Sequence, residues 1–169
     1  MNFTPEALRV GNSGVFEDQH FNRIIEIASG GKRHDPDTIG SFGVGFVSVY
    51  QITDEPRIYS RNQARILRPL ERKALKQTGV THEWPSTFVL PWATQPSRLR
   101  QELEVEPVDL DQMDAFLAQA QDTFSRSAVF LRKVRALHLM SGGTPVNTLT
   151  LTRQANDLTI TSLTGEVTY

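Results

Sequence analysis

The sequence contains no cysteine, and this absence excludes several kinds of site at once. A disulfide framework, a thiolate zinc centre, an iron–sulfur cluster and a cysteine nucleophile all need residues that this chain lacks. An excess of one charge is also missing, because 18 basic residues face 19 acidic ones and the formal net charge is −1. This balance argues against nucleic acid as a partner, although a local basic patch stays open.

Long apolar runs are missing as well, since no stretch approaches the roughly 18 apolar residues that cross a bilayer. We therefore expect no membrane partner. The first ten residues, MNFTPEALRV, lack the basic region and apolar stretch of a secretory signal, which makes the cytoplasm the expected location. A chain of 169 residues suffices for one domain with its own core, with or without an appendage.

Apolar periodicity predicts two helices. Within Asp18–Ala28, apolar residues recur at i, i+3, i+4 and i+7 from Phe21, which is the stripe of an amphipathic helix. A second helix is expected from Asp109 to about residue 134, because its apolar residues repeat at three- and four-residue spacing. Asp109 or Asp111 would cap the start of that helix.

Strand patterns occur in two parts of the chain. Short strands are expected at residues 57–60, 64–68 and 87–92. Near the C-terminus, residues 147–152 and 158–163 alternate strictly between apolar and polar, which is typical of antiparallel strands with one exposed face. Helices followed by strands, with no repeated βαβ unit, indicate an α+β fold.

The two signs of charge separate along the chain. Residues 61–76 carry six basic side chains and one acidic one, whereas residues 102–114 carry six acidic side chains and no basic one. Two solvated faces are the simpler interpretation. The alternative is a pair of complementary patches that dock on each other or on a partner protein.

The segment most informative about chemistry is Ile39–Phe46, IGSFGVGF. Its glycines, Gly40, Gly43 and Gly45, precede an apolar helical run that starts at Phe46. Glycine lets a ligand approach the backbone, and a glycine-rich loop before a helix offers free N–H groups to an anion. The pattern predicts a phosphate-binding loop, with a tight turn against a sheet as the alternative. Neither a P-loop nor a Rossmann fingerprint fits, because the Gly-Lys-Ser/Thr ending and the preceding strand are both missing.

Other motifs surround this loop in a recognisable order. Asn12-Ser13-Gly14 precedes the first helix, Lys32 lies between helix and loop, and Ser86-Thr87 opens the strand at 87–92. With IGSFGVGFVSVY and ITDEPRIYS between them, these motifs resemble the ATP-binding domain of the gyrase, heat-shock chaperone, histidine kinase and mismatch-repair (GHKL) ATPases. The chain is most similar to the sacsin-type branch of the chaperone-like ATPases, over roughly residues 8–92.

The resemblance implies a fold and a division of the chain. The fold would be a two-layer α/β sandwich of the Bergerat type, the fold of histidine kinase-like ATPases, followed by a C-terminal antiparallel β segment. A partial ATP-binding domain would span residues 1–95, a helical connector residues 96–134, and antiparallel strands residues 135–169.

The resemblance also implies that ATP or ADP binds between the helices and the sheet. The residues that would bind it are Asn12, Ser13, Gly14 and Thr87 at the adenine, with Lys32, Gly40, Phe42, Gly43, Val44, Gly45 and Phe46 around the phosphates.

Two departures from the family pattern affect activity. Ser13 stands where the family usually has an aspartate that accepts a hydrogen bond from adenine, so a charge-assisted bond becomes a neutral one. Losing that acceptor would cost about 1–3 kcal/mol, roughly tenfold to a hundredfold in affinity. Only 11 residues precede Asn12, and the family's helix with the general base and the magnesium ligand does not fit in them.

These departures leave three interpretations of function. The first is an ATP-binding module with little or no hydrolysis by itself, no catalytic residue and no identified protein ligand for magnesium. The second is a pseudo-ATPase that binds no nucleotide and acts as a scaffold for a protein partner or a homodimer. The third is a working ATPase whose catalytic helix comes from another chain. The ends of the sequence suggest a fragment, a degenerate copy or half of a split system.

Overall fold

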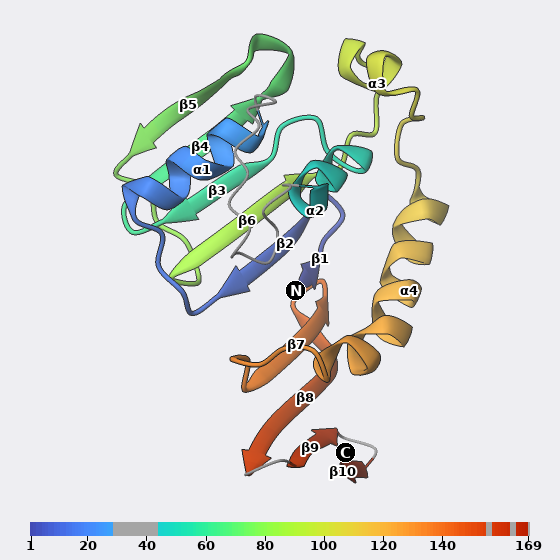
Figure 1. Ribbon diagram of the computed structural model, residues 1–169. Coiled ribbons are helices and arrows are strands. Elements are labelled where there is room, and N and C mark those ends of the chain that lie inside the picture. The colour runs from blue at the N-terminus through green and yellow to red at the C-terminus, as the bar shows by residue number, and fades with distance from the viewer. Residues whose placement is uncertain (29–43, 155–156, 163–164, 169) are drawn as a thin grey trace. The chain divides into compact units, whose positions relative to one another are not determined.

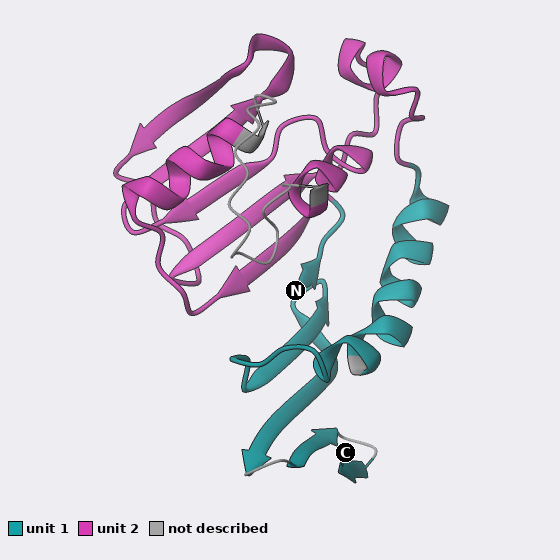
Figure 2. Cartoon of the chain, in the orientation of Figure 1, with its two compact units in different colours: residues 1–5, 109–169 teal, residues 6–108 magenta. Residues whose placement is uncertain are grey.

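The computed structural model of the chain describes residues 1–28, 44–154, 157–162 and 165–168. It divides into two compact units (Figure 2). Unit 1 combines residues 1–5 with residues 109–169, and unit 2 consists of residues 6–108. Each unit mixes helices with mostly antiparallel strands, which confirms the mixed helix-and-strand class.

The described residues of unit 2 form five antiparallel strands in the order β2-β6-β3-β4-β5 (Figure 1). Their bounds are β2 Ala7–Asn12, β3 Arg57–Ser60, β4 Gln63–Arg68, β5 Lys73–Thr78 and β6 Ser86–Pro91. The strands predicted at 57–60, 64–68 and 87–92 are confirmed to within one residue. The strand β5 was not predicted, because its polar residues were interpreted as part of the basic stretch at residues 61–76.

The helices of unit 2 are short apart from the first. The helix α1 spans Asp18–Ala28, as predicted. The helical run expected from Phe46 is divided into α2, Val44–Val47, and the 3₁₀ helix η1, Ser48–Gln51. A second 3₁₀ helix, η2, spans Pro69–Glu71, and α3 spans Arg98–Leu103.

The core of unit 2 lies between α1 and the sheet. Phe21 of α1 packs against Ile58 of β3 and Leu67 of β4, and none of the three has appreciable exposure. Phe16 meets the ring of Phe21 edge-on at 5.5 Å and that of Phe88 at 5.7 Å between centroids. The predicted apolar stripe of α1 is therefore its buried face. Other side chains packed against this core are Ile24, Ile25, Phe46 and Ala74.

Unit 1 consists of a β segment and one long helix. Its strands are β1 Asn2–Phe3, β7 Ala136–Ser141, β8 Thr144–Gln154, β9 Asp157–Ser162 and β10 Gly165–Thr168. The strand β1 pairs in parallel with β7, and the four C-terminal strands pair antiparallel in chain order. The expected C-terminal antiparallel segment is thus confirmed, with β7 as an additional strand.

The long helix of unit 1 is α4, Leu110–Ala128. Asp109 caps it, since its Oδ1 accepts from the Gln112 N–H at 2.8 Å while Gln112 Oε1 accepts from the Asp109 N–H at 3.0 Å. This reciprocal pair is a capping box. The helix ends at Ala128 rather than near residue 134, and it contacts β8.

Candidate functional site

The Asn12-Ser13-Gly14 motif forms the end of β2 and the turn after it. All three residues are exposed. Asn12 Oδ1 accepts a hydrogen bond from the Gly14 N–H at 2.9 Å, the arrangement of an Asx turn. This bond leaves the Asn12 amide N–H groups available as donors. The motif therefore presents polar groups to solvent and has no carboxylate.

A buried hydroxyl fixes the segment that follows the motif. Ser60 Oγ, at the end of β3, accepts from the Phe16 N–H at 2.9 Å and donates to the Pro85 carbonyl at 2.8 Å. The Ser86 hydroxyl lies 2.8 Å from the same oxygen. Because Ser60 has a single proton and gives it to Pro85, Ser86 must be the donor in that pair. Ser60 thus joins the turn before α1 to β3 and β6.

Thr87 occupies a different face of the sheet from Asn12. In the strand register Asn12 is opposite Ser86, whereas Thr87 is opposite Gly11 on β2 and Tyr59 on β3. Side chains alternate along a strand, so Ser86 shares the face of Asn12 and Thr87 does not. Thr87 is only 5% exposed, and its Oγ1 has no hydrogen-bond partner among the described residues.

The glycine loop is described only at its end. Lys32, Gly40, Phe42 and Gly43 lie outside the described residues, and Val44 opens α2. Phe46 is half-buried and packs against the core, with its ring centroid 6.4 Å from that of Phe88.

Gly45 is exposed, and a Cβ added there would meet nothing within 4 Å. Glycine inside a helix costs about 0.5–1 kcal/mol relative to alanine, so the fold alone does not require glycine at this position.

Gly11 is a contrasting case. A Cβ added at Gly11 would overlap the Trp84 ring, so packing alone requires glycine there. The two glycines therefore have different explanations. Gly11 makes room for a side chain of the protein, whereas Gly45 faces space that the described residues leave open.

A buried arginine anchors the segment after α2. Arg100 of α3 is 2% exposed. Its guanidinium donates to the Gln51 carbonyl at 2.6 Å, to Asp54 Oδ1 at 3.1 Å and to the Glu106 carbonyl at 2.9 Å. A charge-assisted hydrogen bond to Asp54 is stronger than a neutral one, and the two carbonyls satisfy further donors. Arg100 therefore fixes the chain directly after η1.

Tyr50 of η1 is buried, and its hydroxyl has no hydrogen-bond partner among the described residues. Burial raises the pKa of Tyr50 to about 12. This phenol therefore remains protonated at neutral pH and does not serve as a base there.

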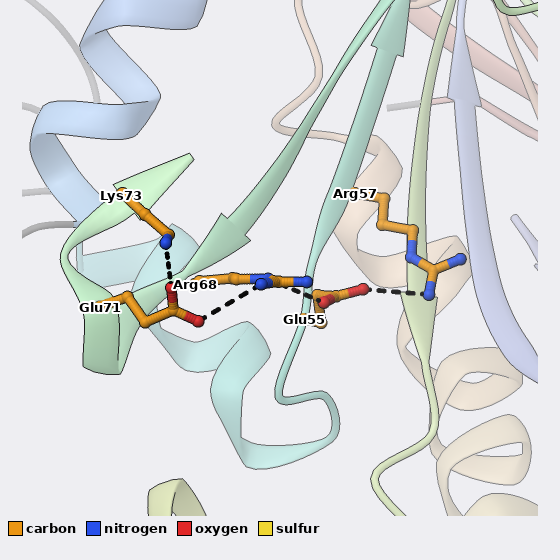
Figure 3. Close-up of polar contacts among 5 residues, drawn as sticks. All are labelled: Glu55, Arg57, Arg68, Glu71 and Lys73. Atoms are coloured by element: carbon orange, nitrogen blue, oxygen red, sulfur yellow. Dashed lines mark hydrogen bonds and ion pairs between the residues drawn. The ribbon is translucent and has the colours of Figure 1, made fainter. Parts of the chain in front are cut away.

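The predicted basic segment is only partly a solvated face. Arg65 is buried with its guanidinium carbon 4.6 Å from the centre of the Phe21 ring, and burial lowers its pKa while the Asp18 carboxylate opposes that shift. A chain of ion pairs joins five further residues (Figure 3). Its distances are 3.1 Å for Arg57–Glu55, 3.4 Å for Arg68–Glu55 and 3.4 Å for Arg68–Glu71, and Lys73 completes it at Glu71.

The Lys73 ammonium, as a hydrogen-bond donor, holds the pKa of Glu71 below its usual value. Ion pairs this exposed each contribute little stability, so the main effect of these pairs is to neutralise charge on this part of the sheet.

Among the described residues, no group of three or more His, Asp or Glu side chains is arranged to hold a metal ion. None of the helices described is long and apolar enough to cross a membrane.

Comparison with known proteins identifies the family. Residues 1–85, about half of the chain, match the Sacsin domain. The chain is also 29% identical to human Sacsin over 168 aligned positions, which cover 79% of this chain and 4% of that protein. The chain thus spans a small part of the relative that it matches. The matched residues include the Asn12 motif, α1, α2 and the strands β3 to β5, and the chain therefore belongs to the Sacsin domain family.

Proposed function

We propose that unit 2 binds ATP or ADP, with the Asn12-Ser13-Gly14 motif at the base and the loop that ends at Gly45 around the phosphates. The resemblance to GHKL ATPases motivates this proposal, and the Bergerat sandwich is the arrangement that it assumes. An antiparallel sheet with α1 packed on one face is compatible with such a sandwich.

The observation that carries the proposal is the glycine at position 45. It stands in a helix, where alanine would be more favourable, and nothing within 4 Å in the described residues prevents a side chain. A ligand that approaches the backbone from outside would explain why glycine occurs at this position. Backbone N–H groups at the start of a helix after a glycine-rich loop are suited to phosphate oxygens.

The unpartnered hydroxyl of Thr87 does not by itself support the site, because its side chain lies on the other face of the sheet from Asn12. A buried hydroxyl without a partner usually has a water or ligand as its complement. Because Thr87 is opposite Gly11 rather than Asn12, a role for it at adenine would have to act through water or a shift of the strand end. Ser86 is the hydroxyl that shares the face of Asn12, and it joins the proposed site although only its neighbour Thr87 was predicted from the sequence as a binding residue.

We propose in addition that nucleotide hydrolysis by this chain alone is slow. The residues before Asn12 form β1 and β2, and their one acid, Glu6, lies between the two strands. Hydrolysis needs a group that orients or activates water and usually a metal clamp. The output of binding would then be conformational, as expected of a chaperone-like module in the cytoplasm.

The proposal is tested with Gly45→Ala and Gly45→Val, using Val47→Ala on the exposed side of α2 as the matched control. Gly45→Ala should keep or raise the free energy of unfolding by the helix-propensity difference, about 0.5–1 kcal/mol, while ATP affinity falls at least tenfold. Gly45→Val should abolish binding. Unchanged ATP affinity in both Gly45 variants would refute the phosphate-loop assignment.

A scaffold that binds no nucleotide is the second candidate, and one observation favours it. In α4, Leu110 is 74% exposed and Phe116 is 38% exposed, so part of its apolar stripe faces solvent. Exposed apolar side chains along one helix are a common feature of protein interaction sites. Retained self-association or partner capture together with an absence of ATP binding would favour the scaffold.

A further inference from the structure

The loop between β5 and β6, residues 79–85, is tied to the turn after β3 by contacts from one histidine. His82 Nε2 lies 2.7 Å from the Arg61 carbonyl oxygen, and His82 Nδ1 contacts the Trp84 carbonyl oxygen. A backbone hydrogen bond of 3.3 Å from the Val80 N–H to the Asn62 carbonyl joins the same two segments. Both nitrogens of one imidazole therefore face carbonyl oxygens.

This geometry distinguishes the two charge states of the ring. A carbonyl oxygen only accepts hydrogen bonds, and a neutral imidazole donates from one nitrogen alone. In the neutral ring the lone pair of the other nitrogen would face the lone pairs of a carbonyl. Only the imidazolium donates to Arg61 and Trp84 at once. Histidine is the side chain whose charge ordinarily changes between about pH 5 and 8.

The side chains around His82 do not explain why both of its ring nitrogens face carbonyl oxygens. From β3, the Tyr59 ring lies 6.3 Å away between centroids. The charged side chains next to His82 in the loop and in the turn are Glu83 and Arg61, which have opposite signs.

The loop also covers the end of β2. The Trp84 ring occupies the space beside Gly11 in which a Cβ would otherwise lie. Gly11 directly precedes Asn12, the first residue of the proposed base-binding motif. A displacement of the Trp84 ring should therefore affect Gly11 first and, through it, the neighbouring Asn12 motif.

We propose that His82 is a proton-dependent latch: its imidazolium holds the 79–85 loop closed with Trp84 seated on Gly11, and loss of the proton releases one end of the loop. The effect on the Asn12 motif rests on the proposed nucleotide binding, whereas the latch itself does not. Because the closed loop supports the end of β2, ATP should bind more tightly at pH 6 than at pH 8, by about 2- to 10-fold, the value of one hydrogen bond.

The latch is tested by the fluorescence of Trp84 in the full chain with Trp92→Phe, so that one tryptophan reports. Its emission should change between about pH 5 and 8, and His82→Gln should abolish the change, because an amide can donate to one carbonyl but does not titrate. His20→Gln is the control, since His20 lies in unit 2 with its Nδ1 accepting from the Glu17 N–H at 3.0 Å. Hydrogen exchange at Val80 should accelerate above the transition.

The outcomes separate the latch from the nucleotide site. A pH transition that persists in His82→Gln, or one that is missing from the parent protein, would overturn the latch. If the emission of Trp84 changes with pH as expected but ATP does not bind at either pH, the latch stands and the proposed function fails. If ATP binds with equal affinity at both pH values, the regulatory part of the proposal is wrong.

Discussion

Two regions of unit 2 are held in place by different kinds of interaction. The α1 region rests on apolar burial, with Phe21, Ile58 and Leu67 packed between helix and sheet. The segment after α2, residues 48–56, also buries apolar side chains such as Ile52, but polar contacts from Arg100 hold it as well. It contains the Tyr50 and Thr53 hydroxyls, which are buried without a partner among the described residues. Buried groups without partners cost free energy, so this segment should open more easily than the core.

This contrast indicates which segment a ligand would stabilise. A core closed by apolar packing has little to gain from a ligand, whereas a segment with buried polar groups that lack partners can be stabilised by one. Residues 48–56 follow directly after α2, the helix that contains Gly45. Nucleotide binding at the loop would therefore be expected to stabilise residues 48–56 more than α1.

The largest expected effect comes from the apolar region. Phe21→Ala should lower the free energy of unfolding by about 3–5 kcal/mol, because it removes a fully buried ring and leaves a cavity. Urea denaturation measures the loss, and Leu70→Ala at an exposed position should have almost none. A loss below about 1 kcal/mol for Phe21→Ala would show that α1 does not stabilise the sheet as described.

A smaller effect is expected at Arg100, where Arg100→Ala removes three hydrogen bonds and leaves the Asp54 carboxylate without this cation. The expected loss is about 2–3 kcal/mol, below that of a fully buried ion pair because Asp54 keeps partial solvent access.

Arg98→Ala is the matched control for Arg100→Ala on the same helix. It breaks an exposed pair with Glu102, with Arg98 79% exposed, and should change stability by less than about 0.5 kcal/mol. Equal effects of the two substitutions would contradict the anchoring role of Arg100.

The smallest effect at neutral pH is expected for Tyr50→Phe, which removes a hydroxyl that has no described partner. The change should stay within about 1 kcal/mol at pH 7. Because the folded-state pKa of Tyr50 is raised to about 12 from 10.0, the folded protein binds more protons than the unfolded chain between these values. Stability contributed by Tyr50 is therefore complete below about pH 10 and lost as the pH rises towards 12.

This alkaline loss should reach about 2–3 kcal/mol at most, and Tyr50→Phe should remove it. Urea denaturation between pH 9 and pH 11.5 measures both proteins. A parallel decline in parent and variant would show that another group is responsible.

The sequence predicted the elements whose patterns are local. The helix α1 and the strands β3, β4 and β6 followed from apolar spacing. Of the two caps that the sequence left open, Asp109 and Asp111, the structure shows Asp109. The strand β5 escaped prediction because most of its residues are polar and at least partly exposed.

The site was predictable only in part, for a physical reason. Asn12, Ser13 and Gly14 form a local turn, so their proximity follows from the sequence. Ser60 and Ser86 are joined to that turn by strand pairing, and register over such separations is not visible in a single sequence. Arg100 was missed because arginine is ordinarily exposed, and only the fold shows that it is buried.

The proposal that this Sacsin-family chain binds ATP is tested by calorimetric titration of the full chain with ATP. The titration is run with and without magnesium, and with Gly45→Val as the control. Binding in the micromolar range, about −8 kcal/mol, is expected, with similar affinity with and without magnesium and no binding to Gly45→Val. The absence of heat and of any thermal shift at millimolar ATP in the parent protein would contradict the proposal.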